Sequence, residues 1–372
     1  MTHPSTAGAA RLVVGRYGED IGGPYRTIAA YREALEAEGL RVRLVGLAAS
    51  PGPGPGEVTN EGLLDVRWWH LGSVARFVRR LGEGPRHELE VVFGVWHLPF
   101  VLSGVRAVLR RPTCRRVLVP TASLSSYDWG KHRVVKSLIA PLVYFLVRRF
   151  DVVLFATVGE SAAARPAVGD RAKVVHEPIA PADVAEQVPW PGMNLACLGR
   201  VAPEKDLPLA FRSLARLQGG TLHVIGDGDA TYVSEVQRVA EHLGLEGRVV
   251  WHGWLPREEA LATVARCSCL LVTSITESYG HAAIEAMSLG VPVVMVDRVA
   301  PATEFAAAGL VLLAEPTDHG VASAVATALE CGSTREGLVA RGRKFAAARS
   351  GAEGRRELAR AILGLRPEGD AS

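Results

Sequence analysis

Two glutamates, Glu277 and Glu285, lie eight residues apart in a segment that reads ESYGHAAIEAMSLGVPVV. The segment follows the apolar run CLLVTS and predicts a helix that opens near Gly280, where the helix dipole and backbone N–H groups favour an anion. Carboxylates beside such a helix start suit hydroxyl groups, so the pattern indicates a ligand with a phosphate and diols. The alternative is a capped surface helix with two exposed glutamates.

Two cations, Arg200 and Lys205, follow the run NLACLG in the sequence GRVAPEK. This places them at the carboxyl end of a predicted parallel strand, where open α/β sheets bind ligands. A guanidinium and an ammonium there would stabilise a diphosphate leaving group as its charge develops. Since single cations in loops are usually solvated, the interpretation depends on their neighbours.

Two glycine-rich turns have the composition of phosphate or nucleotide contacts. The turn 15–24, GRYGEDIGGP, contains Gly22 and Gly23 and leads into a predicted helix, but its spacing is not that of a nicotinamide-binding turn. The run VIGDGD places Asp227 and Asp229 on either side of one glycine, without a third oxygen ligand nearby. We therefore expect no metal there, and we interpret Gly226 as part of a turn beside a nucleotide base.

Short apolar runs separated by stretches of helical length position these residues. They are RLVVG, VRLVGL, EVVFGVW, RVLVP, DVVLFATV, NLACLGR, TLHVIG, RVVWHGW, CLLVTS, VPVVMV and GLVLLA. Alternating strands and helices predict an α/β fold with parallel sheets, and 372 residues are enough for two domains. The proline-rich stretch 179–192 predicts the linker. We expect domains at 1–178 and 179–345, and a C-terminal helix within 346–372 that packs toward the first domain.

Composition and charge restrict the class of protein. The chain is 48% hydrophobic and 22% charged, which excludes disorder for most of it, and it starts without a signal-peptide pattern. We expect a cytoplasmic protein, peripheral to a membrane at most, and no nucleic-acid partner. Residues 1–176 hold 24 Lys and Arg against 15 Asp and Glu. This excess favours an anionic acceptor or membrane surface, or it is an ordinary solvated face.

The segment 131–149, KHRVVKSLIAPLVYFLVRR, has basic ends around an apolar middle. Two interpretations remain open. The favoured one is a core helix between two strands, because a βαβ crossover buries such an apolar middle. The other is a helix that lies on a membrane and presents a lipid-linked acceptor.

Together the motifs resemble retaining glycosyltransferase family 4, which has the GT-B fold: two Rossmann-like domains whose parallel sheets face a central cleft. The resemblance covers nearly the whole chain. It depends on Gly22-Gly23, GRVAPEK, VIGDG, VVWHGW and the two glutamates, which occur in the family's order.

The resemblance implies a metal-independent, hexosyltransferase-like enzyme without a cofactor, which moves a sugar from a nucleotide-diphosphate donor to a hydroxyl acceptor with retention of configuration. The acceptor would be a glycan, a natural product or a lipid-linked molecule. The implied roles are donor diphosphate binding by Arg200 and Lys205, donor sugar binding by Glu277, ribose binding by Glu285, and phosphate binding by backbone amides at Gly22-Gly23 and Gly280-His281. The alternatives are a sugar-nucleotide epimerase or hydrolase and a non-catalytic partner protein with the same fold.

The first half departs from the family pattern. Many members carry a histidine after the strand that here reads RVLVP, whereas this chain continues TASLSSYDW and is similar to a branch without that histidine. The acceptor-binding candidates in this half are His97, Ser123 and Tyr127. A lone histidine beside a tryptophan is more often a packed core residue.

Overall fold

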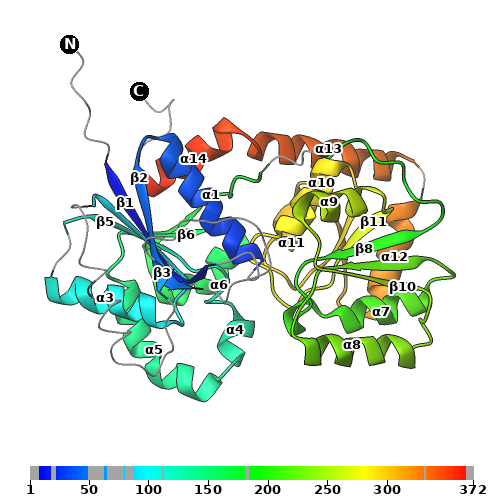
Figure 1. Ribbon diagram of the computed structural model, residues 1–372, viewed down its shortest axis with the longest axis horizontal. Coiled ribbons are helices and arrows are strands. Elements are labelled where there is room, and N and C mark those ends of the chain that lie inside the picture. The colour runs from blue at the N-terminus through cyan, green and yellow to red at the C-terminus, as the bar shows by residue number, and fades with distance from the viewer. Residues whose placement is uncertain are drawn as a thin grey trace, which may run out of the picture. The chain divides into compact units, whose positions relative to one another are not determined.

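The computed structural model describes residues 8–17, 22–48, 63–64, 79, 87–110, 113–180, 184–330 and 332–365. The chain divides into two compact α/β units (Figure 1). The first unit contains the chain up to Pro178 together with the segment from Ala352, and the second unit is Ile179–Gly351. The C-terminal division therefore lies a few residues beyond the expected boundary at 345, because one helix of the second unit continues to Arg349. The proline- and glycine-rich stretch 48–56, whose composition predicts a surface loop, lies almost entirely outside the described residues.

The first unit is built on a parallel sheet. Its described strands lie in the order β3-β2-β1-β4-β5-β6-β7. Their bounds are β1 Ala9–Tyr17, β2 Arg41–Ala48, β3 Leu63–Leu64, β4 Leu89–Phe93, β5 Arg115–Val119, β6 Val152–Phe155 and β7 Ala172–Val174. The five apolar runs predicted in this half are confirmed as β1, β2, β4, β5 and β6. The short edge strands β3 and β7 were not predicted.

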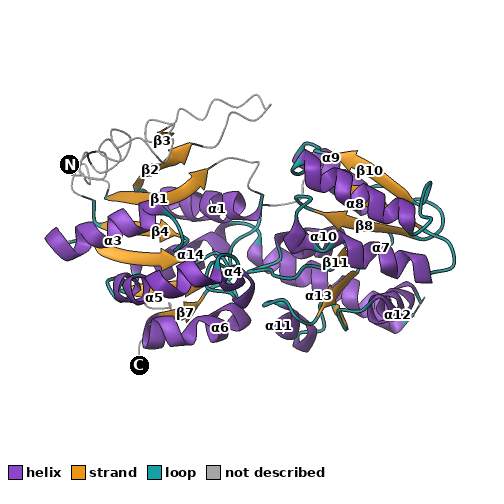
Figure 2. Ribbon diagram, turned by 90° about the horizontal axis from the view of Figure 1, so that it is seen from below, coloured by secondary structure: helices purple, strands orange, loops and turns teal. Residues whose placement is uncertain are grey.

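Helices cover both faces of this sheet (Figures 1 and 2). Their bounds are α1 Gly23–Ala37, α3 Leu98–Arg110, α4 Ser126–Gly130, α5 Arg133–Val147, α6 Val158–Val168 and α14 Ala352–Leu363. On one face α1 and α14 bury a core that includes Leu12, Tyr31 and Leu358. On the other face α3, α5 and α6 bury a second core around Val13 and Phe100.

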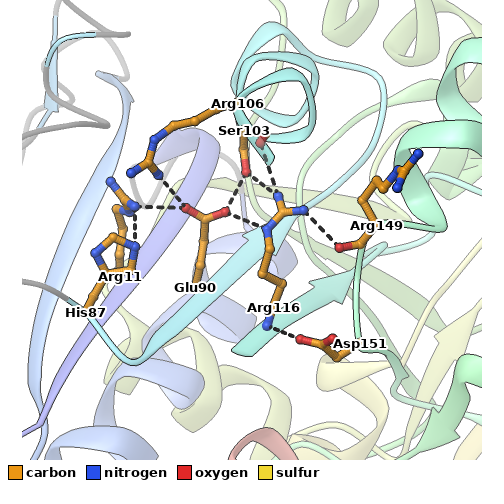
Figure 3. Close-up of polar contacts among 8 residues, drawn as sticks. All are labelled: Arg11, His87, Glu90, Ser103, Arg106, Arg116, Arg149 and Asp151. Atoms are coloured by element: carbon orange, nitrogen blue, oxygen red, sulfur yellow. Dashed lines mark hydrogen bonds and ion pairs between the residues drawn. The ribbon is translucent and has the colours of Figure 1, made fainter. Parts of the chain in front are cut away.

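A row of buried charges crosses three strands of this sheet near their amino ends (Figure 3). The register pairs Arg11 with Glu90 and Glu90 with Arg116. The Glu90 carboxylate lies 3.1 Å from Arg11 Nη2 and 3.1 Å from Arg116 Nε. All three residues are at most 3% exposed, so each charge depends on the others for compensation.

The first turns of α3 complete this row. Ser103 Oγ donates to Glu90 Oε1 at 2.7 Å and accepts from Arg116 Nη2 at 2.7 Å. Burial alone would raise the pKa of Glu90, but Arg116 and Arg11 hold it below its usual value. Burial also lowers the pKa of Arg11 to about 10, against the opposing effect of Glu90. We interpret the row as a structural link between α3 and the sheet.

The second unit contains another parallel sheet, in the order β10-β9-β8-β11-β12-β13. Its strands are β8 Asn194–Leu198, β9 Thr221–Ile225, β10 Val249–Gly253, β11 Cys269–Val272, β12 Val293–Val296 and β13 Leu312–Ala314, which match the six runs predicted in this half. Its helices are α7 Leu207–Arg216, α8 Ala230–His242, α9 Arg257–Ala265, α10 His281–Leu289, α11 Ala302–Ala307, α12 Asp318–Leu329 and α13 Ser333–Arg349. The predicted α/β class with two domains is confirmed.

Each sheet contains a point at which the strand order reverses. In the first unit it lies between β1 and β4, and in the second unit between β8 and β11. Ligands of open α/β sheets bind outside the carboxyl ends of the strands at such points. Within the described ranges, no helix has the length and apolar character needed to span a bilayer.

Candidate active site

The loop after β8 is held in place by close backbone contact with the loop after β9. Val201 N donates to Asp227 O at 2.9 Å. A Cβ atom on Gly226 would lie 2.0 Å from Gly199 O, and one on Gly228 would lie 1.9 Å from Val201 O. Only glycine permits this approach. The predicted Gly226 turn thus fixes the loop that carries the two candidate cations.

Lys205 ends a 3₁₀ turn, Pro203–Lys205, directly before α7. Its ammonium contacts Glu277 Oε1, and Ser274 Oγ donates to the same oxygen at 2.8 Å. Thr273 Oγ1 donates to the Lys205 carbonyl at 3.0 Å, which joins the loop after β11 to the loop after β8. The structure therefore brings together Lys205 and Glu277, which are 72 residues apart in the sequence.

A small pocket opens at these two strand ends. Its polar lining comes from backbone and side chains of Gly199, Arg200, Lys205, Thr273, Ser274 and Glu277. Its apolar lining comes mostly from the strands, including Cys197, Val224 and Leu271, and also from Leu207 of α7 and Ala282 of α10. Cationic and hydroxyl groups above an apolar floor, at the strand-order reversal, suit an anionic ligand that carries hydroxyl groups.

Arg200 lies at the rim of this pocket. Its guanidinium contacts Glu204, and its side chain is about half exposed. Such an exposed pair contributes little to stability, so exchanging Glu204 for a ligand phosphate would cost little.

Gly280 stands directly before α10 with φ at 83°, a left-handed conformation that favours glycine. The helix starts at His281, so Glu277 precedes it rather than forming part of it. Glu285 lies inside α10, is 3% exposed and accepts from Arg257 Nε at 3.2 Å. The alternative of a surface helix with two exposed glutamates is therefore wrong. Glu285 is not part of the pocket lining, and its ribose role stays a prediction.

The oxygens of the Gly-Asp-Gly-Asp turn make local contacts. Asp227 Oδ1 accepts from Gly228 N at 2.8 Å. Asp229 caps α8 by accepting from Thr231 N and Tyr232 N. In the part of the chain that the structure describes, no group of three or more His, Cys, Asp and Glu side chains is arranged to hold a metal ion.

One charged residue near this site was missed in the sequence. Arg298 follows β12 and donates to Asp206 Oδ2 and to the Thr273 carbonyl, at 2.7 Å each. Its Nε donates to the Ser274 carbonyl at 3.0 Å. Arg298 thus supports the loop beneath Glu277. The available signal was its position two residues after the apolar run VPVVMV, where a charge meets the same sheet edge.

In the first unit, Gly22 and Gly23 lie at the start of α1, as predicted. Gly22 is the N-cap with φ at 65°, and Pro24 occupies the first turn. Space is open around both glycines, since no described atom lies within 4 Å of a Cβ added to either. The exposed amides of a helix start suit an anion, but the identity of that anion stays a prediction.

His97 fills the strand-order reversal of the first unit. Its Nε2 donates to the Phe93 carbonyl, and its Nδ1 accepts from Phe100 N at 3.3 Å. The ring packs so closely that a Cβ on Gly15 would lie 2.6 Å from it, and one on Gly94 2.7 Å. Burial lowers the pKa of His97 to about 4. This geometry favours a neutral packing residue that caps α3 over a residue that binds an acceptor.

Ser123 and Tyr127 lie in and after an unusual loop. Thr121 and Ala122 are non-glycine residues in left-handed conformations, with φ of 51° and 63°. The Ser123 hydroxyl contacts the Pro120 carbonyl, and Tyr127 on α4 stacks under the ammonium of Lys131. Both candidates are partly exposed, as is His97.

A buried glutamate that sequence reasoning missed holds this loop. Glu160 Oε1 accepts from Ala122 N at 2.7 Å, and Oε2 accepts from Ala156 N at 3.3 Å. Burial raises the pKa of Glu160 to about 7, although the two amides oppose this, and the nearby carboxylate of Glu177 raises it further. The sequence signal was only a Thr-x-x-Glu helix start at Thr157, which predicts a cap and not a loop contact.

Comparisons with known proteins agree with this geometry. Residues 193–345 match the family "Glycosyl transferases group 1". This region includes the whole pocket and all of the donor-binding candidates in the second unit.

Curated relatives match over part of their length. The chain is 38% identical over 96 residues to lipopolysaccharide 1,6-galactosyltransferase of Salmonella typhimurium, which is 25% of either chain. It is 28% identical over 243 residues to the GDP-mannose-dependent alpha-(1-6)-phosphatidylinositol monomannoside mannosyltransferase of Mycolicibacterium smegmatis, which is 59% of this chain and 61% of that enzyme. The first of these matches thus spans about a quarter of the relative.

Solved structures match over nearly the whole fold. Anabaena HepE in complex with UDP and glucose has a TM-score of 0.74 at 18% identity and covers 95% of this chain and 99% of its own. Sucrose-phosphate synthase of Thermosynechococcus elongatus has a TM-score of 0.76 at 17% identity, over 96% and 98%. These likenesses define a protein of the GT-B fold class. The family match is confined to residues 193–345, within the second unit.

Proposed function

We propose that this protein is a retaining glycosyltransferase that moves a sugar from a nucleotide-diphosphate donor to a hydroxyl acceptor. The observation that carries the proposal is the contact between Lys205 and Glu277 in a pocket at the strand-order reversal of the second unit. In this pocket the Lys205 ammonium, which would bind a diphosphate, lies beside the Glu277 carboxylate, which would bind sugar hydroxyls. This is the pairing that a nucleotide sugar requires.

In this proposal the second unit stabilises the leaving group. Lys205 and Arg200 bind the diphosphate oxygens and neutralise the charge that develops as the nucleoside diphosphate departs. The start of α10 at Gly280 adds the positive end of a helix dipole. Because these groups supply the positive charge, we propose that no metal ion is needed.

Glu277 orients the donor by accepting hydrogen bonds from the sugar hydroxyls. The acceptor hydroxyl oxygen then forms a bond to the anomeric carbon on the face from which the diphosphate leaves. The bond from that carbon to the phosphate oxygen breaks, and the hydroxyl proton passes to the departing phosphate. This front-side route retains the anomeric configuration without a glycosyl-enzyme intermediate.

We assign acceptor binding to the first unit and propose a glycan, natural-product or lipid-linked acceptor. Supporting this division, the strongest donor candidates, Arg200, Lys205, Glu277 and Glu285, all lie in the second unit. The first unit contains the loop with Ser123 and the start of α4 with Tyr127, both partly exposed. The excess of basic residues in this half favours an acceptor that carries negative charge.

A panel of nucleotide sugars tests the proposal. The donor should raise the melting temperature of the protein, because a ligand that binds only the folded state stabilises it. Incubating that donor with candidate acceptors should form a glycoside of unchanged anomeric configuration. Inverted configuration would reject the retaining mechanism. Consumption of donor alone, without any transfer product, would favour an epimerase or hydrolase.

A further inference from the structure

The helix α5 turns an apolar face outward. Six of its large hydrophobic side chains are exposed: Val134, Val135, Leu138, Ile139, Leu142 and Phe145. Val134 is 75% exposed and Leu138 is 77% exposed. Their spacing by one, three and four residues places them along one side of the helix. A surface helix of a soluble domain normally turns polar side chains to water, whereas this side of α5 is apolar.

The opposite side of α5 explains why these side chains face outward. Val143, Leu146 and Val147 pack into the core of the first unit. Lys136 is buried as well, where its ammonium donates to Asp128 and lies 4.8 Å from the Trp96 ring. The contacts that orient the helix therefore bury only a few of its apolar side chains and leave the others exposed. The expected helix between two strands is confirmed, but the expectation that its apolar middle is buried is wrong.

The neighbouring helix α3 extends the apolar face. It packs against α5, since a Cβ on Gly104 would lie 3.0 Å from the Leu146 side chain. Near the end of α3, Val105, Val108 and Leu109 are exposed, the last by 76%. Figure 1 shows α3 and α5 together on the same side of the first unit. We call the exposed apolar side chains of the two helices the α3–α5 face.

Positive charge flanks this face. Lys131 and Arg133 are exposed at the start of α5, and Arg148 and Arg149 are exposed at its end. The segment 131–149 contains no aspartate or glutamate. At the end of α3, Arg110 is exposed. An apolar row with basic residues at both ends complements a bilayer surface, where acyl chains meet anionic headgroups.

We infer that the α3–α5 face docks the first unit onto an anionic phospholipid bilayer, with α5 lying in the interface. The apolar side chains enter the boundary between headgroups and acyl chains, and the flanking cations contact lipid phosphates. A second copy of the chain fits less well, because it would bring the same positive charges together. The inference does not depend on the transfer reaction, since binding to lipid requires neither donor nor acceptor.

Vesicle flotation tests this inference with the full chain. The vesicles are phosphatidylcholine alone, or phosphatidylcholine with phosphatidylglycerol at a molar ratio of about 2:1. The protein should bind the anionic vesicles and release from them at high salt. The double variant Val134→Glu/Leu138→Glu should bind at least about tenfold more weakly, because two charges would enter the apolar interface. Both positions are exposed, so the variant should keep the melting temperature of the parent.

A matched control carries the same two substitutions elsewhere. In Val188→Glu/Leu365→Glu, two exposed apolar residues outside the face are replaced. This variant carries the same two added negative charges, and its affinity for the anionic vesicles should stay within about twofold of that of the parent. No binding by the parent, or equal losses in both double variants, would overturn the inference. A dimer in sedimentation velocity that only Val134→Glu/Leu138→Glu dissociates would also overturn it and assign the face to a second copy. Donor binding measured by calorimetry in parallel reports separately on the proposed function.

Discussion

The two sheets share a parallel topology but use their strand-order reversals differently. In the second unit this position contains a pocket with Lys205 and Glu277, which are 27% and 17% exposed. In the first unit the same position is filled by His97, a neutral ring whose two nitrogens both contact the backbone. One reversal presents charged side chains beside a pocket, and the other is occupied by a neutral ring that packs against Gly15 and Gly94.

The buried charges of the first unit lie at the other end of its strands. Arg11, Glu90 and Arg116 form their row near the amino ends of β1, β4 and β5. Ligands of such sheets bind at the carboxyl ends. A cluster of charges therefore does not identify a ligand site by itself. Its position along the strand direction and its exposure distinguish a structural network from a binding site.

The largest effect should come from breaking the buried row. Glu90→Gln leaves two buried arginines without their carboxylate, so we expect the free energy of unfolding to fall by about 3–5 kcal/mol. Denaturant unfolding measures the loss. Glu36→Gln is the control, because Glu36 forms an exposed pair with Arg32 at 2.8 Å and should change stability by less than about 1 kcal/mol. Donor affinity of the folded Glu90 variant should be unchanged, and a parallel loss of affinity would contradict the structural role.

The next largest effect should come from the pocket of the second unit. Lys205→Ala and Glu277→Ala should each lower kcat by on the order of 100-fold or more, because each removes a contact to the leaving group or the donor sugar. Steady-state kinetics with the donor found by thermal shift measure this. The matched controls are Lys344→Ala and Glu235→Ala, at exposed positions of the same unit. Unchanged turnover in both pocket variants would discard the site assignment.

The sequence predicted the second unit better than the first, for a physical reason. Lys205 and Glu277 lie in the loops that follow β8 and β11, and parallel strands bring their carboxyl ends to one edge. Their proximity therefore follows from topology. The contacts of Glu285 with Arg257 and of Arg298 with Asp206 depend on side-chain orientation, which no local pattern reveals.

In the first unit the informative residues depend on long-range geometry. The row through Glu90 requires the register between β1, β4 and β5, and the register is not visible in three separate apolar runs. The exposure of α5 depends on how few of its apolar residues the sheet and its neighbouring helices can cover. Amphipathic spacing alone did not distinguish a buried side from an exposed one, so the core-helix interpretation was favoured there.

The pH dependence of stability can distinguish the two units further, because the buried Glu160, which holds the loop at Ala122 in the first unit, is titratable. The pKa of Glu160 in the folded protein is raised to about 7, so folding favours its protonated form. Its contribution to stability is complete below the unfolded pKa, near 4.5, and is lost as the pH rises through about 7. We expect a loss on the order of 2 kcal/mol between these values. Glu160→Gln should remove this slope in unfolding experiments from pH 4 to pH 8, and an unchanged slope would contradict the assignment.

A smaller effect should separate acceptor contacts from packing contacts in the first unit. Ser123→Ala and Tyr127→Phe should each raise the acceptor KM by about tenfold, the size of one lost hydrogen bond to a bound ligand, while the donor Kd stays unchanged. His97→Ala should instead lower the free energy of unfolding, because it leaves a cavity beside Gly15 and Gly94. Calorimetric titration of donor set beside acceptor kinetics measures the difference. A loss of donor affinity in the Ser123 and Tyr127 variants would assign them to the donor site.

The smallest expected effect is that of metal removal. The carboxylates whose spacing could suit a metal ion are those of Asp227 and Asp229. They already accept hydrogen bonds from backbone amides of their own turn and of the start of α8. A divalent ion would have to displace these hydrogen bonds and find further oxygen ligands. In the proposed reaction Arg200 and Lys205 supply the positive charge that a metal would otherwise provide. Initial rates should therefore be the same within error before and after treatment with EDTA. A rate that falls with EDTA and returns with manganese or magnesium would show that the turn after β9 contributes metal ligands. The active site would then include this turn.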